Sequence, residues 1–286
     1  PVPALVARPS SYEQVSGLLA WASARGTAVV PLGGGSGVCG AVDPAAGEVV
    51  LDLGALDRIL ELDETHLRVR AQAGLNGMKL EEELRKHALK LGHYPSSLPV
   101  ATVAGLISTR SSGQESTRYG NAEDMVLGLT AVLPDGRLLE SRPFVRSAAG
   151  PPLHQLFVGA EGRLGVIVEA DLQVHPVQPQ RGLGYRFGTL AAGLEAMRRT
   201  VQAGLRPMVM RLYDEDDTQF QAAGLESGCL LVVGVTGPGN TLAEAMEAVA
   251  TASIASASVL PGPVTPTTSR QPDSSPAAWN WVSSSS

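Results

Sequence analysis

The chain lacks the features that assign many proteins to a class at once. It has two cysteines, Cys39 and Cys229, and neither has a second Cys or a His at the spacing of a metal site. No run of 18 apolar residues could form a membrane-spanning helix. Aromatic residues are 4% of the chain, Lys and Arg (22) are outnumbered by Asp and Glu (28), and no basic block occurs. We therefore expect no metal, no transmembrane segment and no nucleic-acid partner.

The composition instead favours a globular protein with many shaped loops. The 286 residues are 44% hydrophobic and include 32 glycines and 20 prolines. This length predicts about two domains. The first residue is Pro1 and no signal peptide follows, so we expect a cytoplasmic protein whose chain begins inside a longer gene product, with peripheral membrane association left open.

Hydrophobic periodicity divides the chain into two structured parts and a tail. Residues 4–31 predict a strand, a helix capped by Ser11 and stopped by Gly26, and a second strand. The stretch 92–124 is rich in Ser, Thr and Gly and is too long for an ordinary loop. Residues 252–286 have no periodicity and are expected to be a disordered or non-native tail. The other predicted elements are strands at 48–53, 58–63 and 66–74, a helix at 76–90, a hairpin at 125–141, a strand at 165–176, and then strand 184–188, helix 190–204, strands 208–213 and 228–235 and helix 240–250.

A glycine-rich loop follows the second strand and allows several interpretations. Gly35 to Gly40 fits GxGxxG, and Asp52 ends the next strand, which imitates a dinucleotide fingerprint. That fingerprint needs a helix opening at the last glycine, but Ala41–Pro44 disfavours one. No Lys-Ser/Thr pair follows the glycines, so a Walker loop is excluded. A backbone nest for an anion and a plain glycine turn remain open.

Four ordered segments give the loop a context. They are Pro31–Gly37, "PSSLPVATVAGLISTRSSG" (95–113), "RYGNAEDMV" (118–126) and "GAEGRLGVIVEA" (159–170). Together they resemble the FAD-binding domain of the vanillyl-alcohol oxidase / p-cresol methylhydroxylase (PCMH) superfamily. Within it, Ser108–Gly113 is most similar to the alkyldihydroxyacetonephosphate synthase branch, because the glycolate and D-lactate dehydrogenase branch usually carries Ala-Thr-Asn-Ala-Gly-Gly there.

The resemblance implies an α+β fold: a two-subdomain PCMH-type FAD-binding domain at 1–178, then the start of an α/β cap domain at 179–251, before the tail at 252–286. It also implies the residues that hold FAD. The first segment would wrap the pyrophosphate, the second would run beside flavin and phosphates, and the last would reach towards adenosine and flavin. The implied cofactor-binding residues are Pro31, Leu32, Gly33, Gly34, Gly35, Ser36, Gly37, Ser96, Ser97, Leu98, Pro99, Val100, Ala101, Thr102, Thr109, Arg110, Ser111, Ser112, Glu161, Gly162, Arg163, Leu164, Gly165, Val166 and Ile167.

Two further residues bear on the chemistry that the resemblance implies. Ser36 stands where a His after a Gly-Gly pair commonly links the flavin covalently, so we expect non-covalent FAD. Arg211 matches an arginine of the first cap strand that points towards flavin and substrate. It alternates with Met208, Met210 and Leu212, which places it on the opposite face of that strand and makes it the candidate catalytic residue; a surface salt bridge is the alternative.

Three functions follow from the resemblance. The first is exchange of an acyl for an alkyl chain on dihydroxyacetone phosphate in ether-lipid synthesis, with a small-molecule or lipid substrate and a homodimer as the assembly. The second is an FAD-linked 2-hydroxyacid dehydrogenase or oxidase. The third is an inert FAD-binding fragment, because the catalytic Tyr and His cluster of the synthase cap have no counterpart in residues 252–286.

Overall fold

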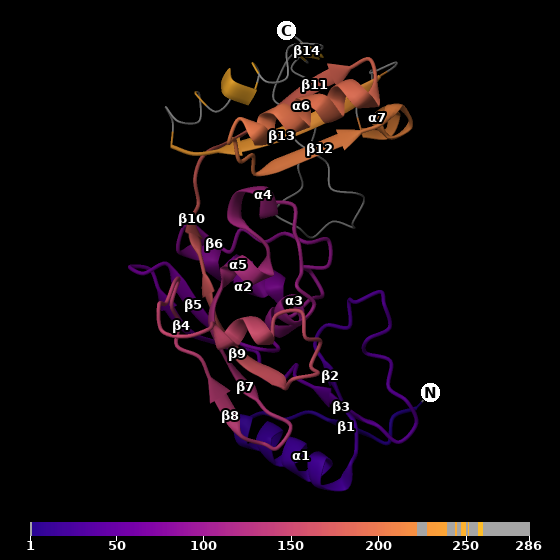
Figure 1. Cartoon of the computed structure of the whole chain (residues 1–286), viewed down its shortest axis with the longest axis vertical. Helices are drawn as coiled ribbons and strands as arrows, with labels where there is room; N and C mark the ends of the chain where they lie inside the picture. The colour runs from indigo at the N-terminus through magenta and orange to yellow at the C-terminus, as the bar shows by residue number, and fades with distance from the viewer. Residues whose placement is uncertain are drawn as a thin grey trace. The chain divides into compact units, whose positions relative to one another are not determined.

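The computed structural model describes residues 2–221 and 228–238, together with 244, 247–249, 251 and 257–259. The chain divides into two compact units, Pro1–Val177 and Gln178–Ser286, here called the first and second units (Figure 1). The expected domain boundary at 178/179 lies one residue further along the chain. None of the helices in the described residues has both the length and the hydropathy that a membrane span requires.

The first unit opens with a small parallel sheet. Its strand order is β1 (Leu5–Ala7), β3 (Val49–Asp52), β2 (Val29–Leu32), and helix α1 (Tyr12–Arg25) connects β1 to β2. The Ser11 side chain caps α1 by accepting the Gln14 N–H, and Gly26 ends the helix at φ 63°, as predicted. In a capping box the Gln14 side chain would accept the N–H of Ser11, but it accepts the N–H of Ser10 instead (2.8 Å). The glycine loop therefore begins directly at the end of β2, with Gly33 following Leu32.

The first unit also contains a five-stranded antiparallel sheet. Its order is β4 (Ile59–Asp63), β5 (Arg68–Gln72), β9 (Val166–Gln173), β7 (Val126–Val132), β8 (Leu138–Glu140). One apolar core joins both sheets, since Leu51 of β3, Val69 of β5 and Val168 of β9 belong to the same buried cluster. The glycine loop and the antiparallel sheet are thus parts of one packed body.

Short helices occupy the Ser/Thr/Gly-rich stretch. Helix α2 (Gly77–Lys86) precedes it and is shorter than the predicted helix at 76–90. Leu89 and Lys90, at the end of the predicted range, form strand β6 instead, which pairs with β10 (His175–Pro176). The stretch 92–124 contains α3 (Val103–Ser108), α4 (Ser116–Tyr119) and most of α5 (Ala122–Met125), and each of these helices is too short to give a recognisable periodic pattern. The helices of this region are α2 (Gly77–Lys86), α3 (Val103–Ser108), α4 (Ser116–Tyr119), α5 (Ala122–Met125) and the 3-10 turn η1 (Leu153–Leu156).

The second unit is an antiparallel sheet with a helix on one face. Its order is β12 (Val209–Tyr213), β13 (Cys229–Thr236), β11 (Gln180–Phe187), β14 (Ala257–Val259), with α6 (Leu190–Gln202) and α7 (Glu215–Gln221). Strand β14 corrects the predicted tail, because the open edge of β11 can hold a small-residue strand by backbone hydrogen bonds alone. The rest of the predicted tail and most of the predicted helix at 240–250 lie outside the described residues. The α+β fold class is confirmed.

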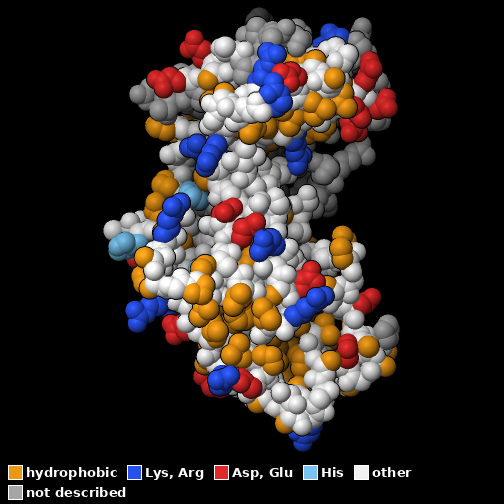
Figure 2. Space-filling view, in the orientation of Figure 1, with side chains coloured by type: hydrophobic (Ala, Val, Ile, Leu, Met, Phe, Trp, Pro, Cys, Tyr) orange, Lys and Arg blue, Asp and Glu red, His pale blue; other side chains and the backbone are white. Residues whose placement is uncertain are grey.

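The surface of the first unit carries a gathering of apolar side chains. Figure 2 shows them on one face, over the region where β7 and β9 are labelled in Figure 1. Exposed apolar residues of the neighbouring sequence are Leu138, Phe144, Val145, Leu153 and Leu156.

Candidate cofactor site

The glycine loop packs against the second sequence segment. A Cβ on Gly33 would lie 2.4 Å from the Thr102 Oγ1, and a Cβ on Gly34 would lie 1.9 Å from the Val100 carbonyl oxygen. Real Cβ atoms do not approach so closely, so both positions require glycine. Two segments that are far apart in the sequence therefore meet in one surface.

The outer part of the loop is open. Gly35, in the left-handed region at φ 64°, is exposed together with Ser36 and Gly37. No acceptor among the described residues takes a hydrogen bond from the backbone N–H groups of these three residues. The loop continues through turns to residue 48 without a helix, which excludes the dinucleotide fingerprint. The exposed N–H groups of Gly35–Gly37 could donate hydrogen bonds to a diphosphate, and the two glycines have no side chain that would block it. This arrangement is the one expected of a backbone nest for an anion.

The second segment is held by hydrogen bonds from the helix before it. Asn76, the N-cap of α2, donates from its side chain to the Pro99 carbonyl (2.9 Å), and the Gly77 N–H donates to the Ala101 carbonyl (2.9 Å). Thr102 caps α3 by accepting the Gly105 N–H. These bonds fix the backbone while the Val100 side chain stays 54% exposed.

The fourth segment closes against the other two. The Gly159 N–H donates to the Ile107 carbonyl and the Glu161 N–H donates to the Ser108 carbonyl, both at 3.1 Å. A Cβ on Gly162 would lie 2.8 Å from the Pro31 Cγ, at the base of the glycine loop. Three of the four sequence segments thus contact one another directly.

Two non-glycine residues at this junction have left-handed backbone. Arg110 has φ 51° and Glu161 has φ 49°, a conformation that costs an L-residue energy unless its surroundings enforce it. The Arg110 side chain lies over Gly159, where a Cβ would come within 3.2 Å of its Nε. Such strained positions gather at binding sites.

The predicted cofactor residues differ in what they can present. Some side chains lie in the core and could offer only backbone: Leu98, Ala101, Thr102, Gly165, Val166 and Ile167. Others are half-buried: Pro31, Leu32, Gly33, Gly34, Ser97, Ser111 and Gly162. The exposed ones could contact a ligand directly. Gly35 and Gly37 could do so only through backbone, and the others through side chains as well: Ser36, Ser96, Pro99, Val100, Thr109, Arg110, Ser112, Glu161, Arg163 and Leu164.

A buried histidine stands behind the second segment. The His93 Nε2 lies 3.1 Å from the Ser111 Oγ, and the ring is 1% exposed. Burial lowers the pKa of His93 to about 4, so the ring is neutral at physiological pH. In the sequence, His93 lies two residues before Pro95, the first residue of the second segment, and this position is what could have marked it as a residue near the site.

Arg211 lies in the second unit, on β12. Met210 and Leu212 pack into the apolar core of that unit, so the intervening Arg211 faces the other side of the sheet, as the alternation predicted. None of the acidic residues that the structure describes forms an ion pair with it.

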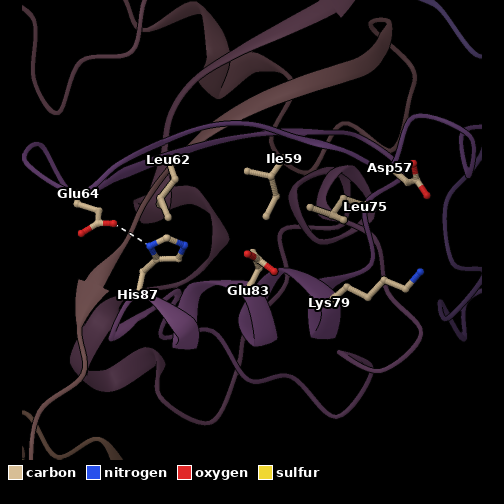
Figure 3. Close-up of a pocket in the computed structure, with 8 residues that line it drawn as sticks. All are labelled: Asp57, Ile59, Leu62, Glu64, Leu75, Lys79, Glu83 and His87. Carbon is tan, nitrogen blue, oxygen red and sulfur yellow. Dashed lines mark hydrogen bonds and ion pairs between the residues drawn. The ribbon is translucent and has the colours of Figure 1, made fainter.

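The most evident pocket lies elsewhere in the first unit. Its volume is about 400 Å³. Figure 3 shows its lining residues, which come from β4, α2 and the residues next to them. Ile59, Leu62 and Leu75 form its apolar wall, and His87 and Glu64 pair at 2.7 Å on its rim. None of the predicted site residues lines it, so the pocket is separate from the surface that the three segments build.

Known proteins resemble the chain in both units. Residues 3–142 match the family described as "FAD binding domain", and residues 178–280 match "FAD linked oxidases, C-terminal domain". Alkyldihydroxyacetonephosphate synthase of Dictyostelium discoideum is 35% identical over 225 residues, which are 77% of this chain and 37% of that protein. The uncharacterized FAD-linked oxidoreductase YgcU of Escherichia coli (strain K12) is 37% identical over 236 residues, 81% of this chain and 49% of YgcU.

A solved structure and a more distant relative complete the comparison. A structure of alkyldihydroxyacetonephosphate synthase superposes with a TM-score of 0.80 at 29% identity, covering 90% of this chain and 52% of that one. Glycolate oxidase subunit GlcD of Bacillus subtilis is 27% identical over 254 residues, 86% of this chain and 54% of GlcD. The chain therefore spans about half or less of the length of these relatives. The structural match confirms the PCMH-type fold. The family match of the second unit runs to residue 280, so it includes most of the predicted tail at 252–286.

Proposed function

Because the chain belongs to the family of FAD-linked oxidases, with FAD as its cofactor, we propose that it works as an alkyldihydroxyacetonephosphate synthase-type flavoenzyme. The observation that carries FAD binding in the first unit is the contact of Gly33 and Gly34 with Val100 and Thr102. This contact leaves the adjoining N–H groups of the loop free for a diphosphate. When bound, FAD supplies the ring chemistry on which the reaction depends.

The residues around the loop have distinct proposed roles. The backbone N–H groups of Gly35–Gly37 bind the pyrophosphate, and exposed Val100 and Leu164 provide apolar contact for the flat rings. Thr109 and Ser112 are exposed hydroxyls that can hydrogen-bond polar ring edges. In this proposal, backbone N–H groups bind the diphosphate, so the site needs no cluster of lysines.

Non-covalent attachment is part of the proposal. Ser36 stands at the position where a linking His would be and is not a group that links to the flavin ring. Cys39 is exposed, but it lies three residues beyond this position. The test is a titration of the purified chain with FAD, followed by acid precipitation. We expect about one FAD per chain and full release of flavin into the supernatant. Flavin in the precipitate would contradict dissociable binding, and a chain that takes up no FAD would overturn the proposed site.

The proposed catalytic residue is Arg211. A guanidinium presents a planar fork that can hold a phosphate through two hydrogen bonds, which suits a phosphorylated ketone substrate. Among the described acidic residues it has no ion-pair partner that would compete for this fork. We expect Arg211→Lys to keep the fold and to lower kcat/KM, because Lys lacks the fork.

The reaction type is tested by two assays on the same flavin-loaded protein. Exchange of labelled fatty alcohol into acyl-dihydroxyacetone phosphate supports the synthase. Bleaching of the flavin absorbance by glycolate or D-lactate supports the second candidate, a 2-hydroxyacid dehydrogenase or oxidase, which is favoured by the similarity to glycolate oxidase subunit GlcD. FAD binding with neither activity supports the inert fragment.

The proposed assembly is a cytoplasmic homodimer. The apolar side chains gathered in Figure 2 give the first unit a face that a second copy could cover. Sedimentation equilibrium of the FAD-loaded chain tests this, and a monomer across the micromolar range would contradict it.

A further inference from the structure

The second segment forms a closed loop whose two ends meet. The Gln114 N–H donates to the Tyr94 carbonyl at 3.0 Å, and a Cβ on Gly113 would lie 2.7 Å from the Tyr94 nitrogen. We call the crossing of residues 90–94 with residues 111–115 the neck. The proposed FAD-lining residues from Ser96 to Arg110 lie in the loop that the neck closes, and Ser111 and Ser112 lie in the neck itself.

A buried ion pair lies at the neck. The Lys90 Nζ is 2.5 Å from the Glu115 Oε2, and each side chain is only 9% exposed. Lys90 comes from β6, on one side of the neck, and Glu115 from the other side, directly before α4. The Lys90 Nζ also lies 5.5 Å from the Tyr94 ring centre and 5.1 Å from that of Tyr119. The ammonium therefore lies near groups from both sides of the neck: the Tyr94 ring on one side, and the Glu115 carboxylate on the other.

Other charged groups complete the surroundings of this pair. Arg85 of α2 donates to the Tyr94 hydroxyl at 2.7 Å. The Glu81 side chain is 1% exposed and accepts the Leu91 N–H at 3.0 Å. Burial raises the pKa of Glu81 and of Glu115, while Lys90 favours the charged form of each. The pair thus belongs to a small polar network in which Glu81, Lys90 and Glu115 are buried and Arg85 is exposed.

Burial determines what such a pair can contribute. A buried ion pair adds little net stability, because desolvation offsets the attraction, but removing one partner leaves a charge without compensation. The arrangement that keeps both partners together is therefore favoured over one that separates them. At the neck, that arrangement holds Lys90 beside Glu115.

We propose that the Lys90–Glu115 ion pair is the positioning device that closes the neck and so presents Ser96–Ser112 to FAD. This inference rests on the proposed FAD site. Neither residue lines the glycine-loop surface, so both act through the backbone of the loop. An apolar pair of similar volume would fill the space but would not fix the position of one chain segment against the other.

The first unit offers a matched control. Lys86 and Glu83, on α2, form an ion pair of the same residue types at the same 2.5 Å, but their side chains are 67% and 40% exposed. Water screens such a pair, so its loss should change neither the loop nor FAD binding.

The decisive variant is the apolar double replacement Lys90→Met with Glu115→Leu, compared with Lys86→Met with Glu83→Leu. Two measurements are made: hydrogen exchange of residues 94–114 without FAD, and the Kd for FAD. We expect the neck variant to keep its unfolding midpoint, to exchange faster in the loop and to raise the Kd about tenfold, which corresponds to about 1.4 kcal/mol. The control pair should match wild type in both.

The conservative variant Lys90→Arg sharpens the result. Arginine can still pair with Glu115, so its Kd should stay within about threefold of wild type. If the apolar neck variant shows wild-type loop exchange and wild-type FAD affinity, the pair has no positioning role. If wild type itself binds no FAD, the proposed function fails, while the exchange measurement still decides whether the pair closes the neck.

Discussion

The two units differ in where they place charge. The first unit buries six ionisable side chains, whereas the buried polar residues described in the second unit are two threonines, Thr200 and Thr218. The apolar core of the second unit lies between its sheet and α6 and needs no charged group. The six in the first unit are Glu81, Lys90, His93, Glu115, Glu169 and Asp171.

The difference reflects what each unit has to fix. In the first unit, buried charges join elements that carry the cofactor segments: Asp171 of β9 binds Arg68 and Arg70 of β5, and Lys90 binds Glu115 at the neck. Apolar packing tolerates several similar arrangements, but a buried charge tolerates only the one that pairs it. The first unit is thus built to hold loops in one geometry, and the second unit is built as a sheet supported by a helix.

The largest effect is expected from Gly34→Val. The new side chain would collide with the Val100 carbonyl and push the glycine loop away from the second segment. Loss of two N–H contacts to a diphosphate should weaken FAD binding by about 3–6 kcal/mol, and overpacking should cost the fold about 1–3 kcal/mol. Fluorescence titration with FAD and chemical denaturation measure the two effects.

Gly37→Ala is the control for that comparison. A Cβ on Gly37 meets no protein atom within 4 Å, so the apo fold should be unchanged. Any loss of FAD affinity in this variant then reports contact with the ligand itself. Wild-type affinity in a folded Gly34→Val protein would show that the loop is only a turn.

The next largest effect separates the units. Phe187 of β11 is fully buried in the core of the second unit, and Phe187→Ala should destabilise that core by about 3–5 kcal/mol. Hydrogen exchange should rise in β11, β12 and β13 but stay unchanged in β5, β7 and β9. Leu194→Ala, at a 54% exposed position of α6, serves as control and should change stability by about 0.5 kcal/mol or less. Equal loss of protection in both sheets would mean that the units unfold together.

Asp171→Asn tests the reliance of the first unit on buried charge. Its Oδ1 accepts from the Arg68 Nη1 at 2.6 Å and from the Arg70 Nε at 3.1 Å. Neutralising it removes the carboxylate that the two guanidinium groups share. Because Arg68 keeps Glu61 and Arg70 keeps Glu169, the cost in unfolding free energy should be that of a charged hydrogen bond, about 1.5–3 kcal/mol. The matched change Glu195→Gln, in the exposed ion pairs of α6, should leave the midpoint unchanged. Equal effects would remove the contrast between the units.

The last effect appears only as the pH falls. The unfolded state takes up a proton on His93 near pH 6.5, but the folded state resists until about pH 4, so folding stability falls as the pH drops between these values. The loss should approach about 3 kcal/mol at pH 4. Glu81 and Glu115, whose pKa values are raised by burial, act in the opposite direction. The measurement is therefore the difference between wild type and His93→Gln, and parallel pH curves would contradict the assignment.

Local sequence predicted the elements that depend on near neighbours. The cap at Ser11, the stop at Gly26 and the alternation that turns Arg211 away from Met210 and Leu212 all follow from residues a few positions apart. Three of the segments predicted to hold the cofactor meet in the structure, and their contact with FAD stays a prediction. The predicted helix at 76–90 ended too late, because pairing with β10 draws Leu89 and Lys90 into a strand.

The sequence alone therefore determined the α+β class and the membership of the FAD-linked oxidase family, and it predicted the segments that we propose approach FAD. Only the tertiary structure decided that Gly34 faces a protein carbonyl while Gly37 faces open space, that Lys90 pairs with Glu115, and that Ala257–Val259 joins β11 as an edge strand. The physical reason is range. Helix caps and strand alternation are set by backbone contacts within a few residues, but a close approach or a buried ion pair depends on chain segments that packing alone brings together.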